Sequence, residues 1–320
     1  MTAPVVVWWT IDSLRRDIID VYGGDVKTQA LSRLASSGTV YDGQSASSWT
    51  LPSVTSILTG DPPKEHGVDS QDDRLQPGSA TLPQHFRHNG WRTLGIVANP
   101  WFSRRKGLDV GFDRFYNITE DESLLRTVSP SALLDHALHY RSRTGGLTAD
   151  TDRHPSEPLI PDLASEWLAS ADRPVFMMVH TQGAHSPYHH PPSWDHHRGA
   201  SDPRRAAYLN LVEFVDAQLE RFLDGIDGEA IVIVTSDHGE ALGEDGNWGH
   251  KIENMDLLLD VPLVIDGASP PFSGSEPVTH LDVHRWLRDD VAPSKRRQGR
   301  SDELEERLKT LGYVDGAHSV

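Results

Sequence analysis

Val5-Val6-Val7-Trp8-Trp9-Thr10-Ile11 is an uninterrupted run of apolar, β-branched and aromatic residues near the start of the 320-residue chain, and Asp12 follows it directly. Runs of this kind form strands that are buried on both faces, as in parallel sheets covered by helices. The stretch therefore predicts a central strand that ends at Asp12.

Helical and strand-like segments alternate along the rest of the chain. Glycines follow several of the helical patterns, and short apolar runs come after them. The predicted helices are 28–37, 52–60, 82–89, 160–171 and 204–223, and the predicted strands are 39–42, 93–97, 175–180, 230–235 and 261–265. This alternation predicts an α/β fold, doubly wound, with a mainly parallel central sheet and helices on both faces.

Composition limits the classes of function. The chain has no cysteine, so a metal would need Asp, Glu, His or hydroxyl ligands. The formal net charge of −17 argues against broad binding to nucleic acid or to anionic membranes. No stretch has the apolar length of a membrane span, and the first residues do not resemble a signal peptide, so we expect a cytoplasmic protein. Abundant acids and a preference for Arg over Lys also suggest a hypothesis of adaptation to high salt.

Polar side chains stand where the predicted strands end. Asp12 follows the first strand, His180 closes a later one, and Asp237 and His238 follow another. Thr50 precedes a predicted helix, whose unpaired N–H groups favour negative charge. Because ligands of doubly wound sheets bind at the carboxyl ends of the strands, we expect these residues to meet around a hard cation. Each residue taken alone has a structural alternative, such as an N-cap role for Thr50.

A set of motifs, in this order, resembles the sulfatase branch of the alkaline phosphatase superfamily. The resemblance extends over nearly the whole chain, since segments 87–115 and 308–313 also match. The motifs are Ile11-Asp12-Ser13-Leu14-Arg15, Thr50-Leu51-Pro52-Ser53, Glu65-His66-Gly67, His180 with His185-Ser186-Pro187-Tyr188, Ser236-Asp237-His238-Gly239-Glu240 and Gly249-His250-Lys251.

The resemblance implies a metal-dependent site with a covalent nucleophile, Thr50. In that reading a bound cation lowers the pKa of the attacking hydroxyl and balances charge on the ester. The metal ligands that it implies are Asp12, Thr50, Asp237 and His238. The residues that it implies for contacting ester oxygens or protonating the leaving group are His185, His250 and Lys251.

The first departure from the family pattern is the residue at the nucleophile position. Family sulfatases have Cys or Ser at the position of Thr50, which is converted to formylglycine, and the β-methyl group of threonine prevents that aldehyde. Val54 replaces an arginine, and Ser13 replaces a second acid. We therefore expect no formylglycine.

The number of metal ions is a second departure. Gly183 stands where the two-zinc branch of the superfamily has an aspartate. A complete second site is thus doubtful, although His185 and His250 could hold a weakly bound ion. We expect one divalent ion, with Mn, Mg, Ca and Zn all compatible with oxygen and imidazole ligands.

These features favour hydrolysis of a phosphate or phosphonate ester, including diesters, through a covalent Thr50 intermediate. An unmodified threonine forms a phosphoester that water can cleave, whereas a sulfo-threonine would be a stable end product. The alternatives are a sulfuric ester hydrolase, a phosphotransferase to an alcohol, and a non-catalytic binding protein with this fold. The expected substrate is a small-molecule, glycan-linked or lipid-linked phosphate or sulfate ester, and the sequence does not indicate an oligomeric state.

The domain organisation follows from the same resemblance. We expect the main α/β domain at 1–270, with an insertion or lid at 117–161 that contains a helix at 130–140. A reduced C-terminal segment, 271–320, is expected to pack on it, with helices at 282–287 and 302–309. His189, His190, His196 and His197 lie in a proline-rich stretch, for which we expect a solvated loop beside the site, with substrate contact as the alternative.

Overall fold

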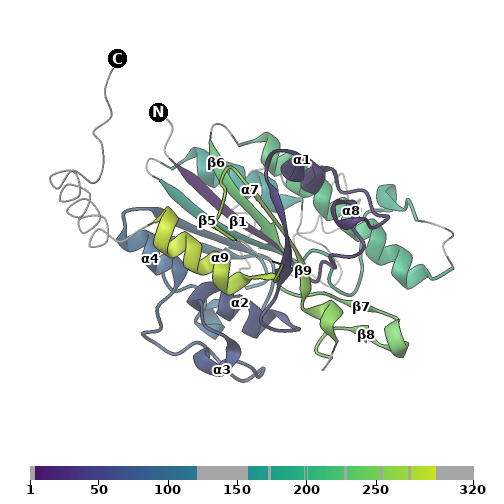
Figure 1. Cartoon of the computed structure of the whole chain (residues 1–320), viewed down its shortest axis with the longest axis horizontal. Helices are drawn as coiled ribbons and strands as arrows, with labels where there is room; N and C mark the ends of the chain where they lie inside the picture. Colours follow the sequence, from purple (N-terminus) through teal and green to yellow (C-terminus); the bar gives the residue numbers. More distant parts are fainter. Residues whose placement is uncertain are drawn as a thin grey trace, which may run out of the picture.

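A mixed, mostly parallel sheet forms the centre of the computed structural model, which describes residues 4–120, 158–171, 174–197, 199, 201–226, 229–252, 255–272 and 275–292 (Figure 1). The strand order within the described residues is β10-β2-β9-β6-β1-β5-β3-β4. The strands are β1 (Val5–Ile11), β2 (Thr39–Gln44), β3 (Arg92–Val97), β4 (Arg114–Asn117), β5 (Val175–Thr181), β6 (Ala230–Thr235), β9 (Asp260–Asp266) and β10 (Val278–Thr279). A separate antiparallel pair consists of β7 (Ala241–Leu242) and β8 (Trp248–Gly249).

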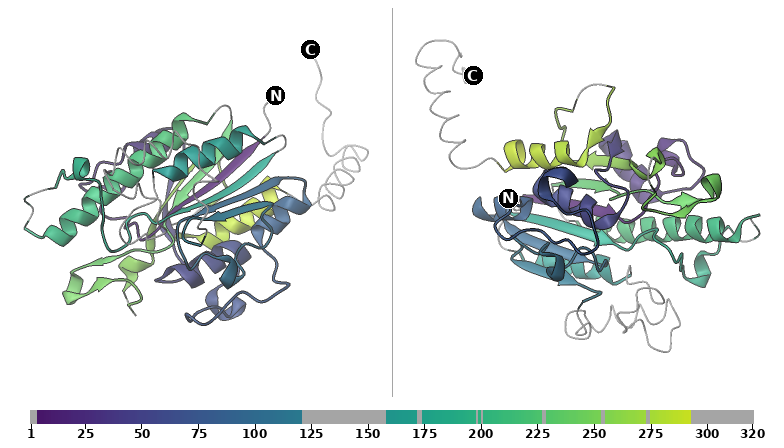
Figure 2. Two further views of the ribbon diagram at one scale, coloured as in Figure 1. Left: turned by 180° about the vertical axis from the view of Figure 1, so that it is seen from behind. Right: turned by 90° about the horizontal axis from the view of Figure 1, so that it is seen from below.

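Helices cover both faces of this sheet, as the views from the front, from behind and from below show (Figures 1 and 2). The α-helices are α1 (Gln29–Ser37), α2 (Thr50–Thr59), α3 (Pro63–His66), α4 (Leu82–His88), α7 (Leu159–Ala169), α8 (Pro203–Asp224) and α9 (His280–Trp286). Short 3-10 or π turns are η1 (Asp20–Tyr22), η2 (Arg104–Lys106), η3 (Pro192–Trp194), η4 (Glu244–Gly246), η5 (Asp256–Leu258) and η6 (Leu287–Val291).

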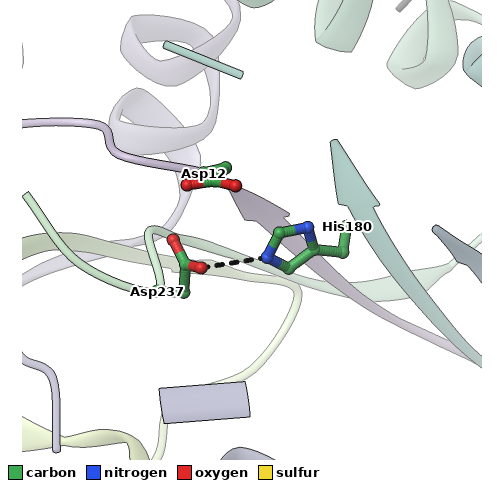
Figure 3. A group of neighbouring side chains, drawn as sticks. All are labelled: Asp12, His180 and Asp237. Atoms are coloured by element: carbon green, nitrogen blue, oxygen red, sulfur yellow. Dashed lines mark hydrogen bonds and ion pairs between the residues drawn. The ribbon is translucent and has the colours of Figure 1, made fainter. Parts of the chain in front are cut away.

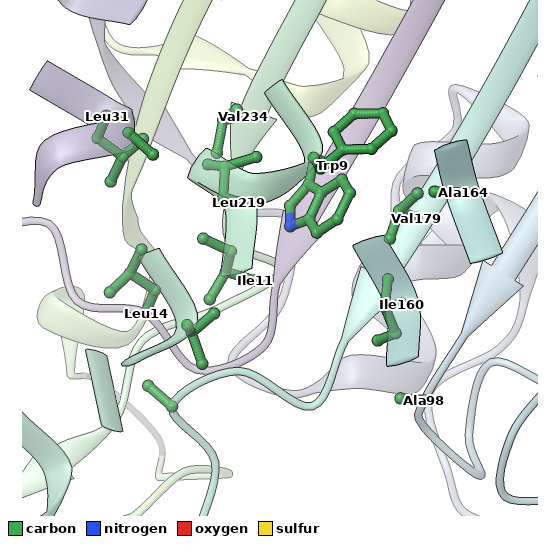
Figure 4. Packing of buried hydrophobic residues seen from close by; sticks show 14 of the residues in the cluster. Trp9, Ile11, Leu14, Leu31, Ala98, Ile160, Ala164, Val179, Leu219 and Val234 are labelled. Atoms are coloured by element: carbon green, nitrogen blue, oxygen red, sulfur yellow. The ribbon is translucent and has the colours of Figure 1, made fainter. Parts of the chain in front are cut away.

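The side chains of β1 alternate between two hydrophobic cores. Trp9 and Ile11 belong to the core formed with α1, α7 and α8, part of which Figure 4 shows. Val6 and Trp8 belong to the core formed with α2, α4 and α9. Because both faces of β1 are covered, every position of the strand must be apolar or small enough to be buried, which explains its uninterrupted sequence pattern.

The parallel arrangement confirms the predicted fold. Strands β6, β1, β5, β3 and β4 run parallel to one another, whereas β9 pairs antiparallel with both β6 and β2. An apolar run has the same pattern in either direction, so the sequence does not reveal the orientation of β9.

Element boundaries differ from the predicted ones most clearly at α2. This helix begins at Thr50 instead of residue 52, and the extended Trp49 is its N-cap without a side-chain cap bond. The N-cap alternative for Thr50 is therefore wrong. Helix α9 also begins two residues earlier than predicted, because Thr279 forms a capping box with Asp282.

Several predicted segments lie outside the described residues. They are most of the expected insertion at 117–161, including the helix at 130–140, and the helix at 302–309. Among the described helices, none combines the length and apolar character that a membrane crossing requires.

Candidate active site

The candidate site lies where β1, β5 and β6 end side by side. Asp12 follows β1, His180 is near the end of β5, and Asp237 comes two residues after β6. Figure 3 shows the three side chains facing one another. Each offers one ligand atom, and these atoms lie within 4.8 Å of one another; within the described residues, this is the group of His and acidic side chains that fits a metal ion. This group lies at the edge of the sheet where the strand-end rule predicts it.

The side chains of this group are buried, and their burial and mutual charges shift the pKa values of the two carboxyl groups. Asp12 and Asp237 are fully buried, and His180 is 1 % exposed. Burial and the neighbouring Asp237 carboxylate raise the pKa of Asp12 well above its usual value. The pKa of Asp237 is lowered despite its burial, because His238 and His180 favour its charged form. Two buried carboxylates at one point, with a nitrogen ligand beside them, fit a hard divalent cation.

His238 adds another lone pair at the same point. Its Nδ1 donates to the carbonyl of Gly239 at 2.8 Å, so Nε2 carries no proton in the neutral ring. Burial lowers the pKa of His238 to about 4, which keeps the ring neutral. Nε2 then faces Asp12 Oδ1 at 3.5 Å, Asp237 Oδ2 at 3.6 Å and Thr50 Oγ1 at 3.2 Å. The structure therefore brings together all the ligands that the resemblance implies, and His180 joins them, as the strand-end pattern predicts although the resemblance does not.

Thr50 is the first residue of α2 and is 2 % exposed. Its helix is tied to the end of β6, because the Ser53 hydroxyl donates to the carbonyl of Asp237 at 2.7 Å. The Ser45 and Ser53 hydroxyls lie 3.0 Å apart and extend this connection to β2. The Thr50 hydroxyl is thus fixed beside the ligands and at the positive end of a helix.

Asn99 and Ser13 orient the Asp12 carboxylate. Asn99 Nδ2 donates to Asp12 Oδ2 at 2.6 Å, and Ser13 Oγ donates to Asp12 Oδ1 at 2.9 Å. The backbone N–H of Ser13 also reaches Asp237 Oδ1 at 3.3 Å. Sequence reasoning missed Asn99, although it follows β3 closely and the strand-end rule applies to it too.

His185 and His250 form a second layer next to His238. The His250 ring centre lies 4.9 Å from that of His185 and 4.6 Å from that of His238. Nδ1 of His250 donates to the buried carboxylate of Glu240 at 2.9 Å, so its Nε2 is the nitrogen left for a ligand. The Tyr188 hydroxyl donates to the other Glu240 oxygen at 2.7 Å. Glu240 was missed as a site residue, although it stands within the Asp237-His238 motif.

The ammonium group of Lys251 lies over the Trp49 ring. Its Nζ lies 3.9 Å from the Trp49 ring centre, and its backbone N–H donates to the Ser48 carbonyl at 3.1 Å. Burial lowers the pKa of Lys251. The predicted residue thus packs on Trp49, the residue before the nucleophile, and follows His250 in sequence.

Gly183 leaves no room for a side chain. Its φ is +58°, and a Cβ at this position would come within 2.6 Å of the backbone carbonyl oxygen of Asp12. The aspartate that two-metal relatives have at this position would require a shift of the Asp12 backbone. This contact gives a physical reason for the doubt about a complete second site.

The histidine-rich loop is attached to α8. His196 Nδ1 and His197 Nε2 lie 2.6 Å and 3.2 Å from the two carboxylate oxygens of Glu213. The His197 backbone N–H also donates to Asn210 Oδ1 at 2.9 Å. These two histidines therefore have structural partners on α8, which the expectation of a solvated loop did not include.

Comparison with known proteins agrees with this fold. The family model described as Sulfatase matches residues 4–271. The low-salt glycan biosynthesis sulfotransferase Agl7 of Haloferax volcanii is 26% identical over 275 residues, which cover 81% of this chain and 53% of that protein. The chain thus spans about half the length of this curated relative.

Solved structures show the same fold at lower identity. The phosphonate monoester hydrolase of Agrobacterium radiobacter superimposes with a TM-score of 0.71 at 18% identity, covering 90% of this chain and 73% of that one. The C-terminal periplasmic domain of EcEptC from Escherichia coli, solved as a complex with Zn, gives a TM-score of 0.67 at 14% identity, covering 92% and 83%. Since the Sulfatase model matches most of the sequence and the strand-end site lies within the matched residues, this chain belongs to the sulfatase family.

Proposed function

We propose that the chain is a metal-dependent ester hydrolase that cleaves a phosphate or phosphonate ester through a covalent Thr50 intermediate. One observation carries the proposal: the buried Thr50 hydroxyl lies at the N-terminus of α2, 3.2 Å from the unprotonated Nε2 of His238. Asp12, His180, Asp237 and His238 would hold a divalent cation there. When bound, such a cation supplies positive charge that favours the Thr50 alkoxide and balances the anionic ester.

The chain's own groups favour the alkoxide as well. The unpaired N–H groups in the first turn of α2 stabilise negative charge at Thr50. Nε2 of the neutral His238 ring and the Thr50 hydroxyl oxygen lie 3.2 Å apart, so the same cation would contact both atoms. Both features hold the nucleophile oxygen in one place before substrate arrives.

The second layer, His185 and His250, would protonate the leaving group. In the proposed reaction the Thr50 hydroxyl loses its proton to water, a bond forms between Thr50 Oγ and phosphorus, and the bond from phosphorus to the alcohol oxygen breaks. The alcohol oxygen would take its proton from Nε2 of a doubly protonated His250, whose ring is held by Glu240, with His185 beside it. Attack by water on the phospho-threonine then releases phosphate or phosphonate and restores the hydroxyl. Lys251 would bind an anionic ester oxygen.

Group transfer is a second candidate, and the name of the Haloferax relative favours it. That relative is called a glycan biosynthesis sulfotransferase. The covalent half-reaction is shared, so an alcohol could replace water in the second step. A sulfuric ester is the corresponding alternative for the donor.

The test compares the protein with Thr50→Ala on aryl phosphate monoester, phosphodiester, phosphonate and sulfate substrates, each with Mn, Mg, Ca or Zn. We expect Thr50→Ala to lower kcat at least about a thousandfold. The matched control is Thr59→Ala at the other end of α2, which should retain activity.

Unchanged turnover in Thr50→Ala would show that Thr50 is not the nucleophile, and faster cleavage of the sulfate ester would reverse the preference for phosphorus. Added alcohol acceptors would reveal transfer through new ester products.

A further inference from the structure

A cavity of about 700 Å³ lies at the β10 edge of the sheet, and the residues that line it are different from those of the candidate active site. They come from β2, from the segment that precedes β10, and from α9 and η6. Helix α9 is the yellow helix of Figure 1. The volume is within the range of pockets that enclose a small ligand. We call this cavity the edge cavity.

The rings of Tyr41, Phe272 and Trp286 line the edge cavity. The Phe272 ring centre lies 5.4 Å from that of Tyr41 and 6.1 Å from that of Trp286, with angles of 77° and 75° between the ring planes. Trp286 is 7 % exposed, whereas Tyr41 and Phe272 are half-buried. Aromatic faces attract cations, and sites with several rings around one point bind ammonium and guanidinium groups. The rings therefore favour a cationic occupant.

Carboxylates at the same cavity favour a cation too. Of the described residues, five with a carboxylate and one with a guanidinium line it. Asp42, Asp282 and Asp289 each pair with an arginine at 3.0 to 3.1 Å. Glu276 and Asp290 are exposed, and within the described residues neither has an ion-pair partner. Two uncompensated negative charges thus lie at the cavity that the three rings line.

A segment of the same chain matches these properties. Residues 293–320 follow the last described residue, Ala292, and Lys295-Arg296-Arg297-Gln298-Gly299-Arg300 places four cationic side chains in six positions. The net charge of the whole chain is −17, so this run has the opposite sign to the chain that contains it. Residues 301–320 contain more acidic than basic side chains and do not match the cavity in this way.

The basic run also lies within reach of the edge cavity. Asp290, which lines the cavity, is two residues before Ala292. An extended chain covers about 3.5 Å per residue, so Lys295 can lie up to roughly 10 Å from Ala292 and Arg300 up to roughly 28 Å. The length of the intervening chain is therefore compatible with binding of this run next to η6.

We propose that residues 295–300 bind in the edge cavity of their own chain. One guanidinium group would lie between the three rings, and other cationic groups of the run would pair with Glu276 and Asp290. The edge strand β10 has only two residues, Val278–Thr279, and the bound segment would cover this end of the sheet. This inference is independent of the reaction that the active site catalyses.

Disulfide trapping tests the proposal cleanly, because the chain has no cysteine of its own. Ser275→Cys in the cavity wall and Gln298→Cys in the basic run form a pair that changes no charge. Under mild oxidation of the full chain, we expect an intramolecular disulfide, measured by loss of free thiols at a rate independent of protein concentration. Ser170→Cys with Gln298→Cys is the matched control, since Ser170 is also exposed but lines a cavity with Arg92 and Arg114. The control pair should react at least about tenfold more slowly.

Charge variants show whether the carboxylates attract the segment. In the protein with Ser275→Cys and Gln298→Cys, Glu276→Gln together with Asp290→Asn should slow disulfide formation about fivefold. Raising NaCl to about 1 M should slow it as well, because the charges are screened. Asp245→Asn removes an exposed carboxylate of η4 and should leave the rate unchanged. The reduced forms of all these variants should have the Tm of the parent, which excludes loss of fold as the cause.

Equal rates for the Ser275→Cys and Ser170→Cys pairs would overturn the inference. So would a rate that does not respond to Glu276→Gln with Asp290→Asn. Disulfide-linked dimers in place of the intramolecular product would also overturn it, because the segment of a second copy would then occupy the cavity. The readout is the disulfide, so a failure of ester cleavage would leave these results valid.

Discussion

At the scale of single residues, Asn99 connects Asp12 to the loop that follows β3. Its amide holds Asp12 on one side and the backbone of Trp101 on the other. Side chains that orient metal ligands in this way fix the ligand geometry and strengthen metal binding.

Asn99→Ala is therefore expected to weaken divalent-metal affinity by about 10- to 100-fold while the protein stays folded. Calorimetric titration with Mn or Zn, together with the rise in Tm on metal addition, measures the change. Asn89, which precedes β3 while Asn99 follows it, provides the control: Asn89→Ala should bind metal normally. Equal metal affinity in Asn99→Ala and the parent would show that Asp12 does not need this orientation.

At the scale of elements, α2 ends where α9 packs against it. Gly60 caps α2 with φ of +76°, and a Cβ there would come within 2.6 Å of the His284 ring. Gly67 caps α3 with φ of +69°, but a Cβ there would meet no atom within 4 Å. The two glycines share the same backbone requirement and differ in the space around them.

Gly60→Ala should therefore lower the free energy of unfolding by about 1–3 kcal/mol more than Gly67→Ala does. Denaturant unfolding of both variants gives the comparison, in which backbone strain largely cancels. Similar losses in the two variants would mean that the His284 ring moves aside without cost.

His284 also makes this helix contact sensitive to acid. Its Nδ1 donates to the carbonyl of Ile57 at 3.0 Å, and burial lowers its pKa to about 4. The pKa in the unfolded chain is near 6.5, so between pH 6.5 and pH 4 the unfolded state binds more protons. The free energy of unfolding must therefore fall as pH falls through this range.

This contribution amounts to at most about 3 kcal/mol, from a shift of about 2.5 pKa units. His284→Asn retains a donor for the Ile57 carbonyl and does not titrate there. We expect the variant to be less stable at pH 8 and the stability difference from the parent to shrink toward pH 4. Parallel stability curves for the two proteins over this range would assign the acid sensitivity to other histidines.

At the scale of the whole molecule, the net charge of −17 makes self-repulsion a general cost of folding. Raising NaCl from about 0.1 M to about 1 M shortens the screening length from roughly 10 Å to roughly 3 Å. At pH 8 we expect Tm to rise with NaCl. Near the isoelectric point of about 5.3 the same addition should have little effect. A fall in Tm with NaCl at pH 8 would contradict the hypothesis of adaptation to high salt.

The sequence predicted the sheet and the strand-end position of the site because both follow from local patterns. Asp12, His180, Asp237 and His238 stand directly after or within apolar runs, so one topological rule places them together. The contact between the Trp49 and Trp101 rings was not predictable in this way, since it depends on how distant loops pack. Asn99 follows β3 closely, so the strand-end rule could have found it, but it has no second feature in the sequence that marks it.

The strand order has a consequence for synthesis of the chain. β1 leaves the ribosome before the other strands of the sheet, yet its neighbours in the finished sheet are β5 and β6, whose residues follow more than 160 positions later. Until they arrive, a valine- and tryptophan-rich segment has unpaired edges on both sides and matches the pattern of aggregation-prone strands. Such long-range pairing folds slowly. The continuous apolar strand that decides the fold is therefore also the segment that most needs shielding, by a chaperone or by rapid collapse, while the rest of the protein is being made.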